Sequence, residues 1–217
     1  MSAAARRRGG IYVRVVKRAF DAAVAAALLL LLLPVMMLVW VAVVAVLGLP
    51  AFYFDQRAGR DGRMIVVGKF RSMRDAQDGA GRPLPDAERL GWLGRFLRRT
   101  SLDELPQLVS VLVGDMSLVG PRPLPLRYVP RYNPRQATRL EVLPGLTGLA
   151  QVRGRNGLDW PQRLELDARY VDMMDRWYAP LVDAAILAAT GGVVLWQALS
   201  GRGISGGGAA TMKEFDP

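Results

Sequence analysis

The chain has 217 residues, enough for one domain with a sizeable core and an additional segment. It contains no histidine and no cysteine, which excludes disulfides, thiolate catalysis and zinc-thiolate sites and leaves acid-base or metal chemistry to carboxylates, with Mg²⁺ as the expected ion. The net charge of +10 predicts an anionic partner: nucleic acid, acidic lipid headgroups or a phosphorylated substrate.

The N-terminal segment predicts a membrane anchor. Basic residues are concentrated before residue 19, and residues 22–54 carry no charge. As one helix this stretch would be about 50 Å long, more than the ~30 Å hydrocarbon core of a bilayer. It is also too long for the apolar core of a cleaved signal peptide. Residues 1–54 are therefore expected to form a basic N-terminus and a helix in contact with membrane lipid.

Pro34 leaves two topologies open for this helix. It lies about a third of the way into the uncharged stretch, so the arm before it is only about 18 Å long. Positive charge on both flanks favours a hairpin that enters and leaves on the cytoplasmic face. The flanking basic residues are Lys17, Arg18, Arg57, Arg60 and Arg63. A tilted, kinked single span explains the pattern about equally well.

A β-hairpin is expected after the anchor. Asp61-Gly62 is a hairpin turn signal, and Met64–Arg71 has the composition of a strand. Lys69 and Arg71 are two residues apart and would share one face of that strand. Two cations on one face can bind a diphosphate, but a solvated edge strand would have the same pattern.

Residues 86–99 predict a single amphipathic helix that mixes bulky apolar residues with arginines. This mixture is typical of a helix lying in the headgroup plane of a membrane. The alternative is an ordinary helix that buries its apolar face in the core and exposes a charged back.

Asp103 and Glu104 precede an apolar helix expected over residues 105–113, with Pro106 in its first turn. By local rules, Ser101-Leu-Asp-Glu104 is a capping box, and these residues alone favour that structural role. The unpaired N–H groups of a helix N-terminus also make the same place suitable for a phosphate. The Gly/Pro-rich turn that follows is expected to present Arg122.

The C-terminal half is expected to contain a glycine-rich loop over residues 143–156 and a charged helix over residues 159–177. The loop carries Gln151 and Arg155, and the helix carries Asp167. Residues 181–199 are apolar, but Asp183 and two glycines interrupt them, which favours a surface or core helix over a second span. Residues 201–217 form a glycine-rich tail.

Seven segments, in order along the chain, resemble the bacterial sugar transferases that are monotopic polyprenyl-phosphate phosphoglycosyl transferases. They are Lys17–Asp21, Gln56–Gly59, Lys69–Met73, Leu97–Gln107, Gly114–Pro123, Pro144–Gln151 and Gly154–Asn156. The tail resembles that of the small branch that includes the diacetylbacillosamine-type enzymes. Leu33 stands where this family often has a serine before the proline.

The resemblance implies transfer of a sugar 1-phosphate from a UDP-sugar to undecaprenyl phosphate with release of UMP. This would be the first membrane step of glycoconjugate synthesis, such as that of an exopolysaccharide. The implied fold is α+β and mostly α, with a re-entrant helix broken at Pro34, interfacial helices and a small β-hairpin. A catalytic domain over residues 55–200 would face the cytoplasm at the bacterial inner membrane. Downstream glycosyltransferases are further candidate partners.

The resemblance also assigns site residues. The family's acid pair corresponds to Asp103 and Glu104, expected to bind Mg²⁺, with Asp103 as the nucleophile that forms a covalent phosphosugar-aspartate. The implied phosphate-binding residues are Lys69, Arg71, Arg122 and Arg155, and Gln151 and Asp167 are further polar site residues.

Two other functions remain open. A catalytically inert, membrane-tethered scaffold of a glycan-assembly pathway would keep the anchor without the chemistry. A tethered nucleic-acid-binding protein would explain the charge, but the arginines are spread among apolar segments and the sequence has no familiar nucleic-acid-binding motif. Nucleic acid is therefore not an expected partner.

Overall fold

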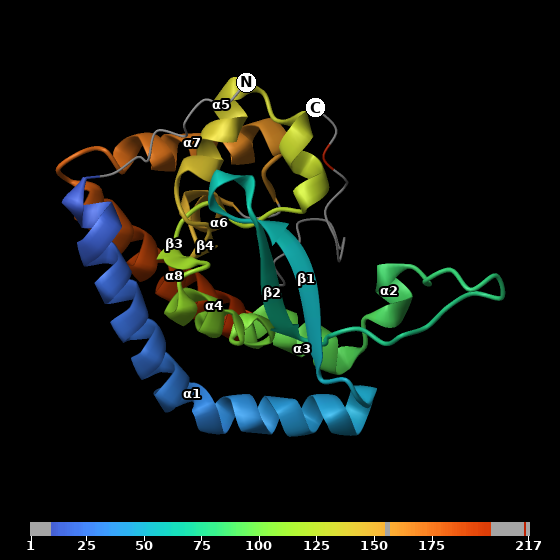
Figure 1. The fold of residues 1–217 in the computed structure, drawn as a ribbon. Coiled ribbons are helices and arrows are strands. Elements are labelled where there is room, and N and C mark those ends of the chain that lie inside the picture. The colour runs from blue at the N-terminus through green and yellow to red at the C-terminus, as the bar shows by residue number, and fades with distance from the viewer. Residues whose placement is uncertain (1–9, 155–156, 201–214, 216–217) are drawn as a thin grey trace.

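The structure, a computed structural model, describes residues 10–154, 157–200 and 215 (Figure 1). The described part is mostly helical and contains two small two-stranded sheets, which confirms the predicted mostly α fold. Two helices in it, over Tyr12–Leu47 and Ala179–Trp196, are long and apolar enough to cross a membrane.

The longest element is the N-terminal helix. A π-helical segment, Tyr12–Val16, leads into α1, Lys17–Leu47, which continues through Pro34. Proline removes a backbone N–H from the helix and its ring crowds the preceding turn. Pro34 lies near the centre of α1 and accounts for the sharp bend seen in the helix (Figure 1). α1 ends at Gly48 (φ 75°), so the end of the uncharged stretch is not helical.

The predicted hairpin is confirmed. β1, Phe52–Ala58, pairs antiparallel with β2, Met64–Phe70. The short 3-10 turn Arg60–Gly62 joins them, and Asp61 adopts a left-handed conformation there (φ 59°). Asp tolerates this conformation better than most residues, which explains why the Asp-Gly signal identified the turn correctly.

The single helix predicted over residues 86–99 is wrong, because the chain forms α2, Asp86–Arg89, and α3, Trp92–Thr100, with an extended break between them. Gly91 is extended at this break (ψ −177°). A Cβ atom at Gly94 would lie 1.9 Å from the Ser72 carbonyl oxygen. The backbone of α3 therefore packs directly against the chain after β2. This contact sets the direction of α3, which differs from the direction that α2 would take if it continued as one helix.

The remaining elements form the second half of the domain. They are α4, Gln107–Val113; β3, Ser117–Val119; a 3-10 segment, Leu126–Arg131; α5, Pro134–Ala137; a second 3-10 segment, Thr138–Glu141; β4, Gly145–Thr147; α6, Leu149–Arg153; α7, Trp160–Met173; and α8, Ala179–Ser200. β3 pairs parallel with β4. The expected loop over residues 143–156 thus contains a strand and a short helix.

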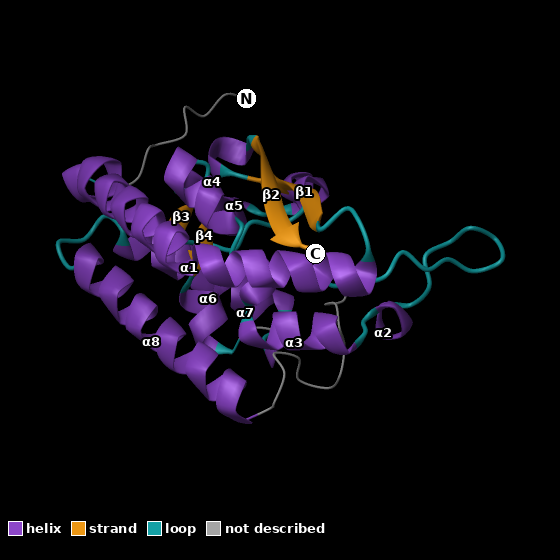
Figure 2. Ribbon diagram, turned by 90° about the horizontal axis from the view of Figure 1, so that it is seen from below, coloured by secondary structure: helices purple, strands orange, loops and turns teal. Residues whose placement is uncertain are grey.

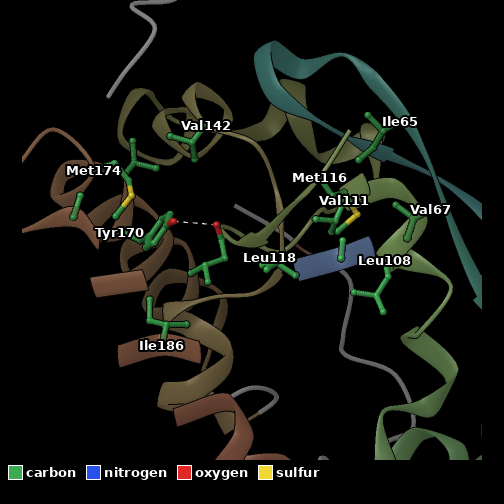
Figure 3. Packing of buried hydrophobic residues seen from close by; sticks show 14 residues of the cluster. Ile65, Val67, Leu108, Val111, Met116, Leu118, Val142, Tyr170, Met174 and Ile186 are labelled. Atoms are coloured by element: carbon green, nitrogen blue, oxygen red, sulfur yellow. Dashed lines mark hydrogen bonds between the residues drawn. The ribbon is translucent and has the colours of Figure 1, made fainter. Parts of the chain in front are cut away.

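Two hydrophobic clusters attach α1 to the rest of the protein. The larger joins the first half of α1 to β2, α4, β3, α7 and α8 (Figure 3). Within it, the Tyr170 hydroxyl lies within hydrogen-bond distance of the Val119 carbonyl oxygen (2.9 Å). The smaller cluster packs Val39 and Val43 of α1 against Leu93 and other residues. α3 contacts both the second half of α1 and α8, and the three helices can be followed from below in Figure 2.

A buried polar group links α1 to α8. Lys17 forms an ion pair with Asp183 of α8 (2.8 Å), and the same carboxylate accepts hydrogen bonds from Tyr12 and Tyr170. A buried carboxylate is tolerated when it is paired and hydrogen-bonded. Asp183, which interrupts an apolar stretch in the sequence, therefore holds two helices together.

Candidate active site

Asp103 and Glu104 lie in a 3-10 turn, Leu102–Glu104, between α3 and α4. The predicted capping box is not formed. Ser101 adopts the left-handed conformation (φ 58°) that ends α3, and its side chain makes no capping hydrogen bond. α4 begins at Gln107, two residues later than expected, and Pro106 is its N-cap residue. The acid pair precedes the helix as predicted, but its side chains are not used for capping.

Glu104 is held by two cations. Its Oε1 atom accepts hydrogen bonds from Lys69 Nζ and Arg122 Nη2, each 2.6 Å long. Burial alone would raise the pKa of Glu104, but the charges and hydrogen bonds of Arg122 and Lys69 outweigh it and hold the pKa well below its usual range. Glu104 is therefore ionised and fixed in place at neutral pH.

Asp103 has the opposite environment. It is only 7% exposed, and its carboxylate forms no hydrogen bond or ion pair with any residue that the structure describes. Burial, and then the charge of Glu104, raises the pKa of Asp103 to about 6 despite the opposing effect of nearby cations. Two neighbouring carboxylates with divergent pKa values are a common sign of divided catalytic roles.

Lys69 and Arg71, expected to act together, are separated. Lys69 reaches the acid pair from β2. Arg71 lies just beyond β2 and donates to the carbonyls of Leu47 and Gly48 and to the Asp75 carboxylate. The unpaired carbonyls at the end of α1 attract a cation. The structure thus brings Lys69 to the acid pair and Arg71 to the C-terminal end of α1.

The turn after β3 presents Arg122 to Glu104, as the glycine and proline pattern predicts. Two backbone hydrogen bonds hold this turn against β4. The Gly120 N–H donates to the Thr147 carbonyl (2.9 Å), and the Gly145 N–H donates to the Pro121 carbonyl (2.9 Å). A Cβ atom at Gly120 would lie 2.5 Å from the Leu143 carbonyl oxygen. Only glycine fits this approach between the two strands.

Asp167 contributes indirectly through Arg139. Asp167 is 1% exposed and accepts hydrogen bonds from Arg139 Nη2 (2.8 Å) and Nε (3.2 Å). Arg139 in turn donates to the Arg122 carbonyl (2.6 Å) and to the Tyr132 hydroxyl (3.0 Å). Asp167 therefore orients the residue that supports Arg122. Sequence reasoning missed Arg139, because nothing in its local pattern separates it from the many exposed arginines.

Two further predicted residues lie outside this arrangement. Gln151 is buried in α6 beside the Gly148 backbone, and among the described residues its side-chain amide has no hydrogen-bond partner. In the described structure Gln151 forms no hydrogen bond with Asp103 or Glu104. Arg155 lies outside the described residues.

The acid pair suits a hard divalent cation only in part. The described residues contain no group of three or more carboxylates. In the part of the chain that the structure describes, the acid pair thus offers two carboxylates. Asp103 has no hydrogen-bond partner there, and Glu104 is bonded through one oxygen. Mg²⁺ is commonly held by one or two carboxylates together with substrate phosphates and water. The donor set fits Mg²⁺ on the condition that a phosphate supplies further oxygens.

Comparison with known proteins agrees with the resemblance of the motifs. A family model described as bacterial sugar transferase matches residues 12–197. An uncharacterized sugar transferase EpsL of Bacillus subtilis is 48% identical over 73% of this chain and 78% of its own length. The undecaprenyl-phosphate galactose phosphotransferase of Salmonella typhimurium is 41% identical over 84% of this chain but 41% of its own. The UDP-glucose:undecaprenyl-phosphate glucose-1-phosphate transferase of Caulobacter vibrioides is 38% identical over 79% of this chain and 69% of its own length. The chain belongs to the bacterial sugar transferase family.

Proposed function

We propose that the protein transfers a sugar 1-phosphate from a UDP-sugar to undecaprenyl phosphate and releases UMP. The names of the Salmonella and Caulobacter relatives support the class of donor and acceptor. The observation that carries the proposal is the contrast within the acid pair. Glu104 is fixed by two cations, whereas Asp103 is buried and has no hydrogen-bond or ion-pair partner among the described residues. One carboxylate is thus free to react beside cations able to bind a diphosphate.

Asp103 is the proposed nucleophile. A carboxylate oxygen of Asp103 attacks the sugar-bearing phosphorus of the UDP-sugar, the bond from that phosphorus to the UMP oxygen breaks, and UMP leaves with the bonding electrons. A phosphate oxygen of undecaprenyl phosphate then attacks the same phosphorus and regenerates the Asp103 carboxylate. A pKa of about 6 supports this role, because at pH 7 the carboxylate is mostly ionised yet more basic than an ordinary one.

Glu104, Lys69 and Arg122 are proposed to prepare the phosphates for attack. A diphosphate repels an approaching carboxylate, so cations must first neutralise its oxygens. Glu104 binds Lys69 and Arg122 through the same oxygen and so holds both cations at one point beside Asp103. Asp103 and Glu104 are also the residues that would hold Mg²⁺, which when bound adds further charge neutralisation at the phosphates.

The anchor is proposed to be re-entrant, with the catalytic domain on the cytoplasmic side of the bacterial inner membrane. Near the start of α1, Arg18 donates to the carbonyls of Val111 and Leu112 in α4. At its other end, Arg71 donates to Leu47 and Gly48. Both ends of α1 are therefore bonded to the same folded unit, whereas a straight helix of this length would separate them by about 45 Å.

Exposed apolar side chains support a position at the membrane surface. Leu30, Leu31 and Leu38 of α1 and Trp92 and Phe96 of α3 are all exposed. Such residues favour lipid over water. The phosphate of a polyprenyl acceptor lies at the headgroup level, so this position would bring it to the acid pair.

A topology test uses the absence of native cysteine. Single cysteines at positions 10 and 60 should react with a membrane-impermeant reagent from the same face of sealed vesicles. Labelling from opposite faces would reject the re-entrant model in favour of a single span.

The function is tested with purified protein in detergent, Mg²⁺, undecaprenyl phosphate and a panel of UDP-sugars. We expect UMP release with at least one sugar, and intact mass measurement after quenching should detect a phosphosugar adduct at Asp103. Asp103→Asn should abolish both signals while membrane extraction stays normal. Failure to release UMP from every sugar would favour the inert scaffold, and an adduct on Glu104 would reverse the roles of the two acids.

A further inference from the structure

Phe215 near the C-terminus is docked in an aromatic pocket of the catalytic domain. Its ring centroid lies 5.3 Å from Trp160, 5.5 Å from Tyr128 and 5.9 Å from Tyr132, and it is only 2% exposed. Its backbone is held as well, because Arg131 donates to its carbonyl (2.7 Å) and its N–H donates to the Tyr128 hydroxyl (3.3 Å). Both the side chain and the backbone of this one residue are therefore specifically bound.

The pocket is connected to the proposed phosphate-binding arginine by direct contacts. Tyr132, which forms one wall, accepts a hydrogen bond from Arg139 through its hydroxyl (3.0 Å), and the Arg139 guanidinium lies over its ring (5.6 Å). Arg139 also donates to the Arg122 carbonyl (2.6 Å). Three contacts thus lead from Phe215 through Tyr132 and Arg139 to the backbone of Arg122.

Arg139 needs this wall for its orientation. It is 3% exposed, and its three nitrogens point to three different partners: Asp167, the Tyr132 hydroxyl and the Arg122 carbonyl. Tyr132 itself is only partly buried, so Phe215 supplies packing that restricts its ring. Loss of Phe215 would free Tyr132 to change rotamer and would leave Arg139 with two of its three partners.

We infer that Phe215 is a positioning residue for Arg122, and that docking of Phe215 in its pocket and binding of the donor diphosphate are energetically linked. The inference rests on the proposed function, since it assigns Arg122 to the phosphates. Phe215 touches neither acid and takes no part in bond making. Its effect travels through Tyr132 and Arg139, so it alters the geometry of the site without altering its charge.

The test is a double-mutant cycle in the full-length chain with Phe215→Ala and Tyr132→Phe. Each substitution should lower kcat/KM for the UDP-sugar about tenfold, because a misplaced substrate-binding group costs at least this much. KM for undecaprenyl phosphate should stay within about twofold of wild type in both variants. If both residues act along one path, kcat/KM of the double variant should be no lower than that of the less active single variant.

Several controls separate positioning from general stability. Phe215→Leu retains apolar volume and should recover activity to within about threefold of wild type. Trp177→Ala removes an aromatic residue that is 87% exposed and should leave kcat/KM unchanged. Tyr132→Phe keeps the ring and removes only the hydroxyl, so it tests the same path should Phe215→Ala fail to fold. The inference would be overturned if Phe215→Ala kept the wild-type kcat/KM. It would also be overturned if the losses in kcat/KM from the two single variants multiplied in the double variant.

Amide hydrogen exchange gives a readout that does not depend on turnover. Phe215→Ala should accelerate exchange at Gly120, whose N–H is bonded to Thr147, and over the 3-10 segment Leu126–Arg131. If no UDP-sugar is turned over, the proposed function fails while this measurement still tests the positioning inference. Unchanged exchange at both places would reject the inference even in an active enzyme.

Discussion

Asp103 is expected to lower the stability of the folded protein at the pH at which it works. Its pKa is raised from an ordinary value of 3.8 to about 6, chiefly by burial. A raised pKa means that the folded state favours the protonated carboxyl. The resulting stabilisation is fully present below about pH 4 and is lost as the pH rises through 6. At about 1.4 kcal/mol per pKa unit, ionised Asp103 costs roughly 3 kcal/mol at pH 8.

Asp103→Asn should therefore stabilise the protein in a pH-dependent way, because Asn has nearly the same shape and no charge. We expect a gain of about 3 kcal/mol at pH 8 and almost none at pH 4. For a chain of this length the gain at pH 8 corresponds to an increase in Tm of roughly 6–12 °C. UMP release should be lost at every pH.

The assay is thermal unfolding in detergent from pH 4 to pH 8 with a chelator present, so that bound metal does not contribute. Exposed Asp115 provides the control, because Asp115→Asn removes a carboxylate without removing a buried charge. Its effect on Tm should not vary with pH. A difference between wild type and Asp103→Asn that stays constant with pH, or an Asn variant that is less stable at pH 8, would refute the reasoning.

Four further substitutions test the other charged groups. Glu104→Gln should have the opposite effect to Asp103→Asn, with a loss of about 3 kcal/mol of stability because two cations lose their charged partner, and thermal unfolding at pH 7 measures it. Lys69→Ala should raise KM for the UDP-sugar at least tenfold more than Arg71→Ala does, because Lys69, unlike Arg71, contacts the acid pair. Arg71→Ala should lower Tm more, because it leaves the carbonyls at the end of α1 without their donor. Asp183→Ala should cost about 3–5 kcal/mol, because Lys17 loses its closer carboxylate partner and keeps only Asp21 at 3.8 Å, and the hydroxyls of Tyr12 and Tyr170 lose an acceptor. It should also expose α8 to limited proteolysis, and cleavage no faster than in wild type would contradict this link between α1 and α8.

Features set by local chemistry were predictable from the sequence. The hairpin follows from Asp61-Gly62 between two strand-like runs, because left-handed turn geometry selects those residues. The long apolar helix α1 follows from the uncharged stretch in the sequence, and its bend follows from Pro34. The place of the acid pair before α4 follows from Pro106, because proline is favoured at a helix start.

Features set by contacts between distant segments were not predictable. The break between α2 and α3 lies at Leu90 and Gly91, and beyond it Gly94 packs against the Ser72 carbonyl, a contact that no local pattern encodes. Lys69 and Arg71 were predicted to act together because residues two apart on a strand share one face. β2 ends at Phe70, however, and Arg71 donates instead to the carbonyls at the end of α1. Arg139 became identifiable only when the fold placed it between Asp167 and Arg122.

Ser101 shows how tertiary partners overrode a local rule. A capping box contributes about 1 kcal/mol, whereas a hydrogen bond between charged groups contributes about 1.5–3 kcal/mol. Glu104 makes two such bonds, to Lys69 and Arg122, so its carboxylate turns away from the Ser101 backbone. Ser101 is then left in the left-handed conformation, which favours glycine.

Ser101→Gly consequently distinguishes the two arrangements by the sign of its effect. In the observed conformation glycine should raise the free energy of unfolding by about 0.5–1 kcal/mol, because it removes the strain of a side chain at φ 58°. If Ser101 capped a helix, the same change would lower it by a few tenths of a kcal/mol. Ser101→Ala is the matched control, since it removes the hydroxyl, keeps the strained Cβ and should leave Tm nearly unchanged. A destabilised glycine variant would mean that the serine hydroxyl contributes to the turn after all, and that the acid pair is positioned by capping as well as by its cations.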